Sequence, residues 1–77
     1  MNTRKAHGPA IRAIRKALGV RQDELAIAAD MSPSHLHRIE TGERQPSEAA
    51  LSLICLRLGI NKDDVTYTVA ARELVAA

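Results

Sequence analysis

The chain has 77 residues, of which 45% are hydrophobic, and a formal net charge of +2. This length allows one domain, and a core of Ile, Leu, Val and Ala without Phe or Trp favours short, closely packed helices, so we expect a compact all-α bundle of four to five helices. No apolar run is long enough to cross a bilayer and no signal-peptide segment follows Met1, which argues against a membrane or secreted protein and predicts a cytoplasmic one.

Basic residues are concentrated at the start of the chain. The first 21 residues carry no acid and six basic side chains, which are Arg4, Lys5, Arg12, Arg15, Lys16 and Arg21. This asymmetry gives the molecule a positive end, which fits either a solvated helix face with a basic tail or contact with DNA phosphates. Residues 1–7 show no apolar periodicity, and we expect them to form a flexible arm.

A first helix is predicted over Ala10–Leu18, after a glycine–proline pair and before a glycine. Its apolar residues recur at i, i+3 and i+7 and are expected to face the core: Ile11, Ile14 and Leu18. Arg12 and Lys16 fall on the opposite side, where they are solvent charges that can also reach a phosphate. Arg15 lies at the edge of the apolar stripe, where a cation without a partner would be costly.

The stretch Gln22–Gly42 is typical of two short helices joined by a tight turn. The second helix begins at Ser32, whose hydroxyl can cap a free amide, and Pro33 takes the first helical position. Leu36 and Ile39 anchor this helix to the core. Its outward side carries Ser34, His35, His37, Arg38 and Thr41. Two short helices with so short a link must cross steeply, which is the geometry of a helix-turn-helix.

The pattern QxxLAxxAxxSxxxLxxIExG over Gln22–Gly42, followed by xRxP, resembles the Xre-type family of phage repressors, Cro proteins and small bacterial regulators. The resemblance covers Ile11–Ile60 and implies a lambda-repressor-like domain with a central helix-turn-helix, which we place at residues 8–60. The family usually has glycine in the turn where this chain has Asp30. Aspartate tolerates a left-handed backbone at a cost on the order of 1 kcal/mol.

The resemblance implies a function as well. It implies a transcriptional regulator that binds an operator in double-stranded DNA, a Cro-like or minimal immunity repressor of phage or prophage origin. We expect no enzyme, cofactor, membrane partner or small-molecule ligand, because the chain has no glycine-rich phosphate loop and no nucleophile with a base at a fixed spacing. The alternative is an antitoxin-type or other protein-binding module on the same fold, whose expected mark is a long disordered tail.

Candidate base-reading residues lie near the start of the second helix of the motif, which enters the major groove first. These are Ser34 and His35, with Arg38 one turn behind Ser34. Arg38 is the strongest candidate, because a guanidinium can donate two parallel hydrogen bonds to guanine. His37 and Thr41 are expected at phosphates, and Ser34 fits a base or a phosphate.

The resemblance also assigns four residues outside that face. In many such domains an arginine at the place of Arg15 pairs with the glutamate at the place of Glu40, and two independent surface charges are the alternative. Gln22 lies where the start of a helix meets a DNA phosphate. In the family, the loop after the second helix of the motif lies along the DNA backbone and carries a basic residue, and Arg44 is at the matching place.

The end of the chain allows two structures. A fourth helix is predicted to end at Leu58. In residues 61–77, Asn61 with Asp64 resembles a capping box and favours a fifth helix, whereas the alternation in VTYTV is typical of a short strand. We favour the helix. Either structure leaves apolar surface, so this segment is a possible dimerisation element, and a two-fold dimer would place two reading helices about 34 Å apart on a near-palindromic site.

The histidines and the cysteine predict neither a metal site nor catalysis. His35 and His37 are two residues apart and project to nearly opposite sides of a helix, so they cannot hold one metal ion together. Cys55 is alone and cannot form an internal disulfide. It shares a helical face with Leu51 and Ile54, which indicates a packing residue rather than a nucleophile.

Overall fold

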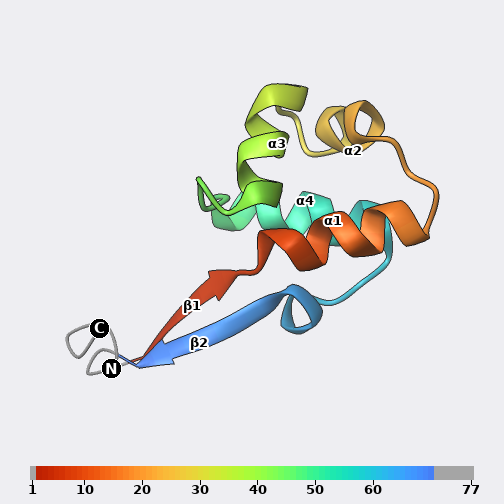
Figure 1. The fold of residues 1–77 in the computed structure, drawn as a ribbon. Helices are drawn as coiled ribbons and strands as arrows, with labels where there is room; N and C mark the ends of the chain where they lie inside the picture. Colours follow the sequence, from red (N-terminus) through yellow and green to blue (C-terminus); the bar gives the residue numbers. More distant parts are fainter. Residues whose placement is uncertain (1, 71–77) are drawn as a thin grey trace.

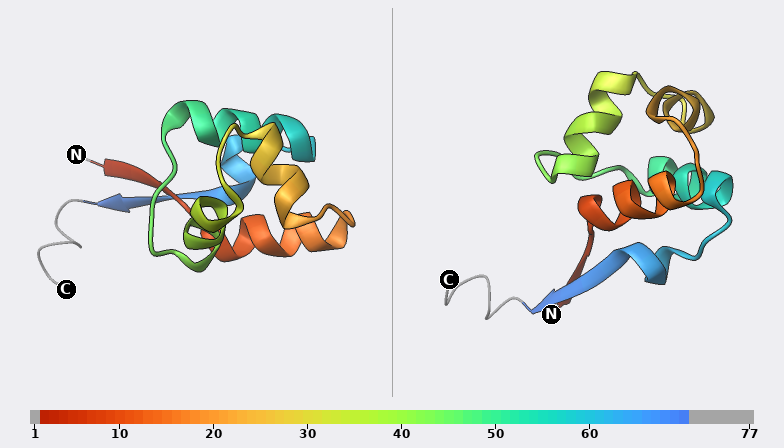
Figure 2. Two further views of the ribbon diagram at one scale, coloured as in Figure 1. Left: turned by 90° about the horizontal axis from the view of Figure 1, so that it is seen from above. Right: turned by 45° about the vertical axis from the view of Figure 1, so that its right-hand side comes forward.

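The computed structural model describes residues 2–70, which form four α-helices, a short 3-10 helix and a two-stranded sheet (Figure 1). In chain order the elements are β1 (Asn2–Ala6), α1 (Gly8–Ala17), α2 (Gln22–Ala28), α3 (Pro33–Thr41), α4 (Glu48–Leu58), η1 (Lys62–Val65) and β2 (Thr66–Ala70). The helices form one body, and the two strands run side by side away from it (Figure 2).

The helical body closes around one apolar core. The buried side chains are Ala6, Ile11, Val20, Leu25, Ala26, Ala29, Leu36, Ile39, Leu51, Ile54, Cys55, Leu58 and Val65. Helix α3 packs against both α1 and α2, and α2 also packs against α4. Leu18 was predicted to face the core, but it is 54% exposed, because α1 ends at Ala17 and Leu18 already belongs to the turn.

Helices α1, α2 and α4 end in the same hydrogen-bonded turn. The residues that follow them in the left-handed conformation are Gly19, Asp30 and Gly59. After α2, the N–H of Met31 donates to the carbonyl of Ala26 at 2.9 Å, and that of Asp30 donates to Ile27 at 3.1 Å. These two bonds define a Schellman motif, which satisfies the last free carbonyls of the helix. Asp30 has φ of 57°, so its predicted left-handed conformation is confirmed.

Replacing Asp30 by glycine should therefore stabilise the protein. Its side chain is exposed, and glycine adopts a positive φ without the steric cost of a β-carbon. We expect a gain of up to about 1 kcal/mol, which raises Tm by roughly 4 to 8 °C. Thermal unfolding followed by circular dichroism measures it. Asp30→Ala is the control, because it removes the charge and keeps the β-carbon; an equal gain in that variant would trace the effect to charge.

Residues 2–6 form strand β1, so the prediction of a flexible arm over residues 1–7 is wrong for them. The strand pairs antiparallel with β2, from Asn2 opposite Ala70 to Ala6 opposite Thr66. Beside this ladder, the N–H of His7 donates to the carbonyl of Val65 at 2.7 Å. Main-chain bonds to the other end of the described chain hold this segment, so it forms a strand although its sequence has no apolar periodicity.

The segment after α4 forms one turn of 3-10 helix and then a strand, so the favoured prediction of a fifth helix is wrong and the alternative, a strand, is correct. The N–H of Asn61 does bond to the carboxylate of Asp64 at 2.9 Å, but this cap starts only η1. The β-branched residues that follow pair with β1. The described fold is thus mostly helical with a small sheet rather than all-α. Residues 71–77 of the predicted dimerisation segment lie outside the described residues.

Candidate nucleic-acid interface

Helix α3 is anchored by three buried residues on one side. These are Leu36, Ile39 and Glu40. The hydroxyl of Ser32 caps the helix by accepting from the N–H of His35 at 3.1 Å, and Gly42 ends it with φ of 89°. Because the anchors share one side of the helix, the opposite side is left to solvent. The exposed residues there are Ser34, His37, Arg38 and Thr41.

A buried ion pair fixes α3 to α1. Glu40 is 1% exposed and Arg15 is 7% exposed. The guanidinium of Arg15 donates two bonds to the Glu40 carboxylate, from Nε at 2.7 Å and from an Nη at 3.1 Å, and a third to the carbonyl of Val20 at 2.9 Å. The predicted pair is therefore present in the structure, and the alternative of two independent surface charges is wrong.

Gln22 joins this network from the start of α2. Its Nε2 donates to Oε1 of Glu40 at 3.1 Å, so the carboxylate accepts from three nitrogens. Among the described residues, no buried side-chain nitrogen or oxygen lacks a partner. The network links α1, α2 and α3 through the Glu40 carboxylate, on the buried side of α3. Gln22 was predicted to bind phosphate, and the structure gives it a positioning contact that leaves one amide hydrogen for such a ligand.

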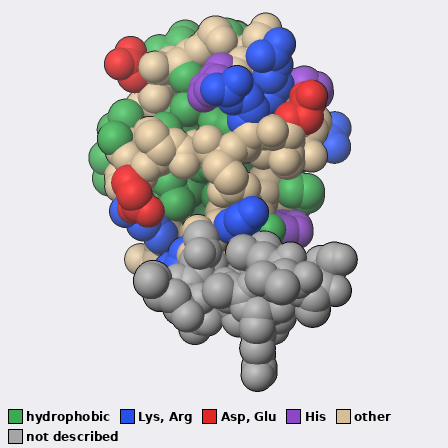
Figure 3. Space-filling view, turned by 90° about the vertical axis from the view of Figure 1, so that its left-hand side faces the viewer, with side chains coloured by type: hydrophobic (Ala, Val, Ile, Leu, Met, Phe, Trp, Pro, Cys, Tyr) green, Lys and Arg blue, Asp and Glu red, His purple; other side chains and the backbone are tan. Residues whose placement is uncertain are grey.

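The exposed side of α3 borders a shallow hollow of about 400 Å³. Its lining is formed by Gln22, Pro33, Ser34, His37, Arg38 and Glu43. Basic and histidine side chains gather over the upper end of the molecule, with an acidic side chain beside them (Figure 3). The structure thus brings Ser34 and Arg38 of the predicted base-reading set together with His37 and Gln22 of the predicted phosphate set.

The other predicted residues lie apart from that hollow. His35 is half-buried and lines a separate hollow with Asp30 and Ser47, on the side of α3 that faces α4. The hydroxyl of Thr41 already donates to the carbonyl of Arg38 at 3.1 Å. Arg44 is exposed in the loop after α3. Two further predicted phosphate ligands, Arg12 and Lys16, are exposed on α1.

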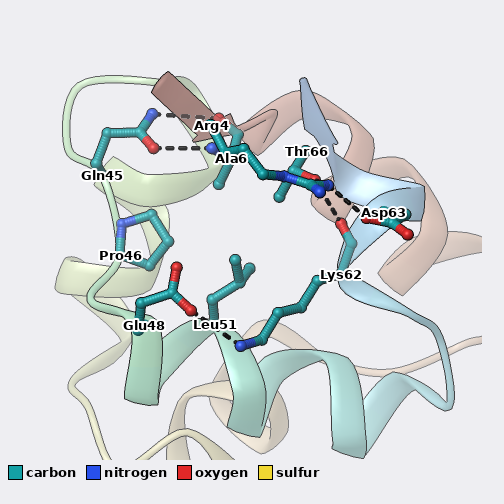
Figure 4. A pocket seen from close by; sticks show the side chains of 9 residues that line it. All are labelled: Arg4, Ala6, Gln45, Pro46, Glu48, Leu51, Lys62, Asp63 and Thr66. Carbon is teal, nitrogen blue, oxygen red and sulfur yellow. Dashed lines mark hydrogen bonds and ion pairs between the residues drawn. The ribbon is translucent and has the colours of Figure 1, made fainter. Parts of the chain in front are cut away.

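Two residues that matter for the position of α3 were not identified from the sequence. Gln45 uses its side-chain amide to bond the main chain of Ala6 twice, accepting from the N–H at 2.9 Å and donating to the carbonyl at 3.1 Å (Figure 4). Gly8 is buried where α1 meets the end of α3, and a β-carbon there would overlap the carbonyl oxygen of Ile39. A glycine at the start of a helix is common as a local signal, and no spacing in the sequence marked Gln45.

The structure places Cys55 in the core, and burial raises the pKa of its thiol by disfavouring the charged thiolate. The prediction of a packing residue is confirmed. Within residues 2–70, no three histidine, cysteine or acidic side chains come together in a way that could hold a metal ion. No helix in that range is long and apolar enough to span a membrane.

Comparisons with known proteins give a family and a fold. A family model described as a helix-turn-helix domain matches residues 8–68. Two crystal structures of the clp gene regulator ClgR from Corynebacterium glutamicum are similar at 37% identity. One has a TM-score of 0.69 and is matched over 74% of this chain and 74% of that chain; the other has a TM-score of 0.71, with 74% and 61% covered. No curated protein sequence matches significantly.

Proposed function

Since the chain belongs to the helix-turn-helix domain family, we propose that it binds specific sites in double-stranded DNA and regulates transcription there. The similarity to ClgR, a gene regulator, supports this function. The observation that carries the proposal is the exposed polar side of α3, with Ser34 and Arg38, on a helix that the buried pair of Arg15 and Glu40 fixes from behind. A rigid helix with such a side fits the major groove.

We assign base reading to Arg38 and Ser34. The Arg38 guanidinium is exposed at the hollow, where it can present two parallel donors to the O6 and N7 of a guanine. His35 lies on the side of α3 that faces α4, so in this assignment it reads no base.

Backbone contacts fall to the residues around that centre. His37 lies on the exposed side of α3 and Arg44 in the loop after it, and Arg12 and Lys16 add positive charge from α1. Phosphate contacts position a protein on the duplex and carry no sequence information. The specific role that the resemblance implies is a Cro-like or minimal immunity repressor, which would act by occupying a promoter and excluding polymerase.

Selection of bound DNA from a random pool tests the proposal. A regulator of this kind should enrich one half-site of a few base pairs, and its affinity for that site should fall linearly on a log–log plot against salt, by roughly 0.9 log units for each phosphate neutralised. An antitoxin-type module that binds only protein would enrich no site. If the DNA that the protein retains at low salt showed no sequence preference, the proposal would be contradicted.

Arg38→Ala should abolish preference at one base-pair position. A bidentate arginine–guanine contact contributes about 1 to 3 kcal/mol of discrimination, so the selected half-site and its variant at that position should become nearly equal in affinity. Competition binding against all single-base variants measures this. Arg44→Ala is the matched control, because it should weaken every site alike and reduce the salt slope by about 1. If Arg38→Ala still ranked all single-base variants by affinity in the same order as the wild type, the assignment would be refuted.

A further inference from the structure

Gln45, in the loop after α3, is bonded to the main chain of strand β1. Its side-chain amide accepts from the N–H of Ala6 at 2.9 Å and donates to the C=O of Ala6 at 3.1 Å. Ala6 is opposite Thr66 in the sheet, and residues of an antiparallel strand direct their main-chain groups alternately toward and away from the partner strand. Because the groups of Ala6 point to Gln45, this amide occupies the place that the peptide of a third strand would take.

Ala6 is a fixed point of attachment for the loop. Its exposed fraction is 7%, and the next residue, His7, joins it to the rest of the fold. The N–H of His7 donates to the carbonyl of Val65 at 2.7 Å, and its Nδ1 accepts from the N–H of Ala10 at 3.1 Å to cap α1. The end of β1 is thus held by the sheet on one side and by α1 on the other, so a loop that is bonded to it is held as well.

Packing contributes little to the position of this loop, because a hollow lies beneath it. The hollow has a volume of about 220 Å³ and is lined by residues of the loop, α4 and the sheet, among them Pro46 and Leu51. Figure 4 shows the Gln45 amide reaching across one rim of the hollow to Ala6. A loop released from these bonds would have room to move inward, so the two amide bonds set its distance from the sheet.

Arg44 is the residue that the Gln45 bonds position. It precedes Gln45 in the loop, is exposed, and is assigned a phosphate contact in the proposed function. Its N–H donates to the carbonyl of Arg38 at 3.2 Å, which ties the loop to the last turn of α3 on one side, and Gln45 ties it to β1 on the other. Helix α3 has its own buried anchors, so Arg38 stays in place without Gln45.

We infer that Gln45 is a positioning residue for DNA binding: it holds the loop against β1 and so places Arg44 at a phosphate of the DNA backbone. The inference rests on the proposed function and deepens it. Affinity for all sites depends on Gln45 in this arrangement, whereas preference among bases depends on α3 and does not. Gln45 itself touches no DNA in this role, because its amide is directed at Ala6.

Gln45→Met tests this role, because methionine has nearly the same length and makes neither bond. The dissociation constant should rise by one common factor, at least about threefold, for the selected site and for each of its single-base variants. The salt dependence of binding should become shallower, by up to about 1 in the log–log slope, as in Arg44→Ala. Gly19→Ala is the control for lost stability, since it strains the turn after α1 and should change neither quantity.

A double-mutant cycle shows whether Gln45 acts through Arg44. Fluorescence anisotropy titrations of the wild type, Gln45→Met, Arg44→Ala and the double variant give the four dissociation constants. If Gln45 positions Arg44, then Arg44→Ala should cost at least about threefold less affinity in the Gln45→Met background than in the wild type, whereas independent residues would give additive losses.

NMR of the free protein measures the loop without DNA. The amide order parameter of Arg44 should fall in Gln45→Met, and that of Arg38 should stay unchanged. Additive losses, an altered ranking of single-base variants, or an unchanged order parameter for Arg44 would each overturn the inference. A wild type that selects no DNA site would overturn the proposed function and this inference with it, and because that result is seen before any variant is compared, the two failures are distinguishable.

Discussion

Glu40→Ala is expected to destabilise the protein by about 3 to 5 kcal/mol. The Glu40 carboxylate is buried and accepts two hydrogen bonds from the buried Arg15 and one from the half-buried Gln22. Removing it leaves the Arg15 guanidinium buried with only the carbonyl of Val20 as partner. A domain of this size is stable by only about 4 to 12 kcal/mol, so the loss is a large fraction of the total.

Thermal and urea unfolding measure the effect, with Glu43→Ala as the matched control. Glu43 is an exposed carboxylate just after α3, and its removal should change the free energy of unfolding by no more than about 0.5 kcal/mol. The double variant Arg15→Met with Glu40→Leu should recover most of the loss, because it buries no unpaired charge. At a temperature where Glu40→Ala remains folded, its ranking of DNA sites should match the wild type. An unaltered Tm would rule out the structural role.

The sequence predicted the helical body well, because its signals are local. Ser32, Pro33 and Gly42 mark the ends of α3 through caps and a left-handed turn, and the structure has each of them in that role. The burial of Leu36 and Ile39 follows from helical periodicity alone. Glu40 was predicted as the partner of Arg15 from the resemblance, because helical periodicity shows only that a cation lies at the edge of the core and does not identify the group that pairs with it.

The two-stranded sheet of β1 and β2 could not be predicted in the same way. Residues 2–6 and 66–70 are far apart in the chain, and only their pairing makes strands of both. The capping box at Asn61 was a correct local signal, but it starts only a single 3-10 turn. The β-branched residues that follow form a strand because they pair with β1. Gln45 and Gly8 could not be identified for a related reason: their roles depend on main-chain groups brought near them by tertiary structure.

Gly8→Ala should be the second strongly destabilising substitution, although alanine is the better helix former. A β-carbon at this position would overlap the carbonyl oxygen of Ile39 and come within 2.9 Å of that of Glu40. Both obstacles are main chain of α3, so no side chain can rotate to make room, and α1 and α3 must move apart. We expect a loss of at least about 3 kcal/mol, which lowers Tm by roughly 12 °C or more on the scale of about 4 to 8 °C per kcal/mol.

Gly19→Ala separates this steric effect from the backbone preference of glycine. Gly19 has φ of 72°, and no atom lies within 4 Å of the place a β-carbon would take, so its replacement should cost only about 1 kcal/mol of left-handed strain. Because α3 carries the exposed side with Arg38, a folded fraction of Gly8→Ala should also bind its selected DNA more weakly, whereas Gly19→Ala should bind normally below its Tm. Equal unfolding free energies for the two variants would show that α1 and α3 do not meet as closely as the position of Gly8 requires.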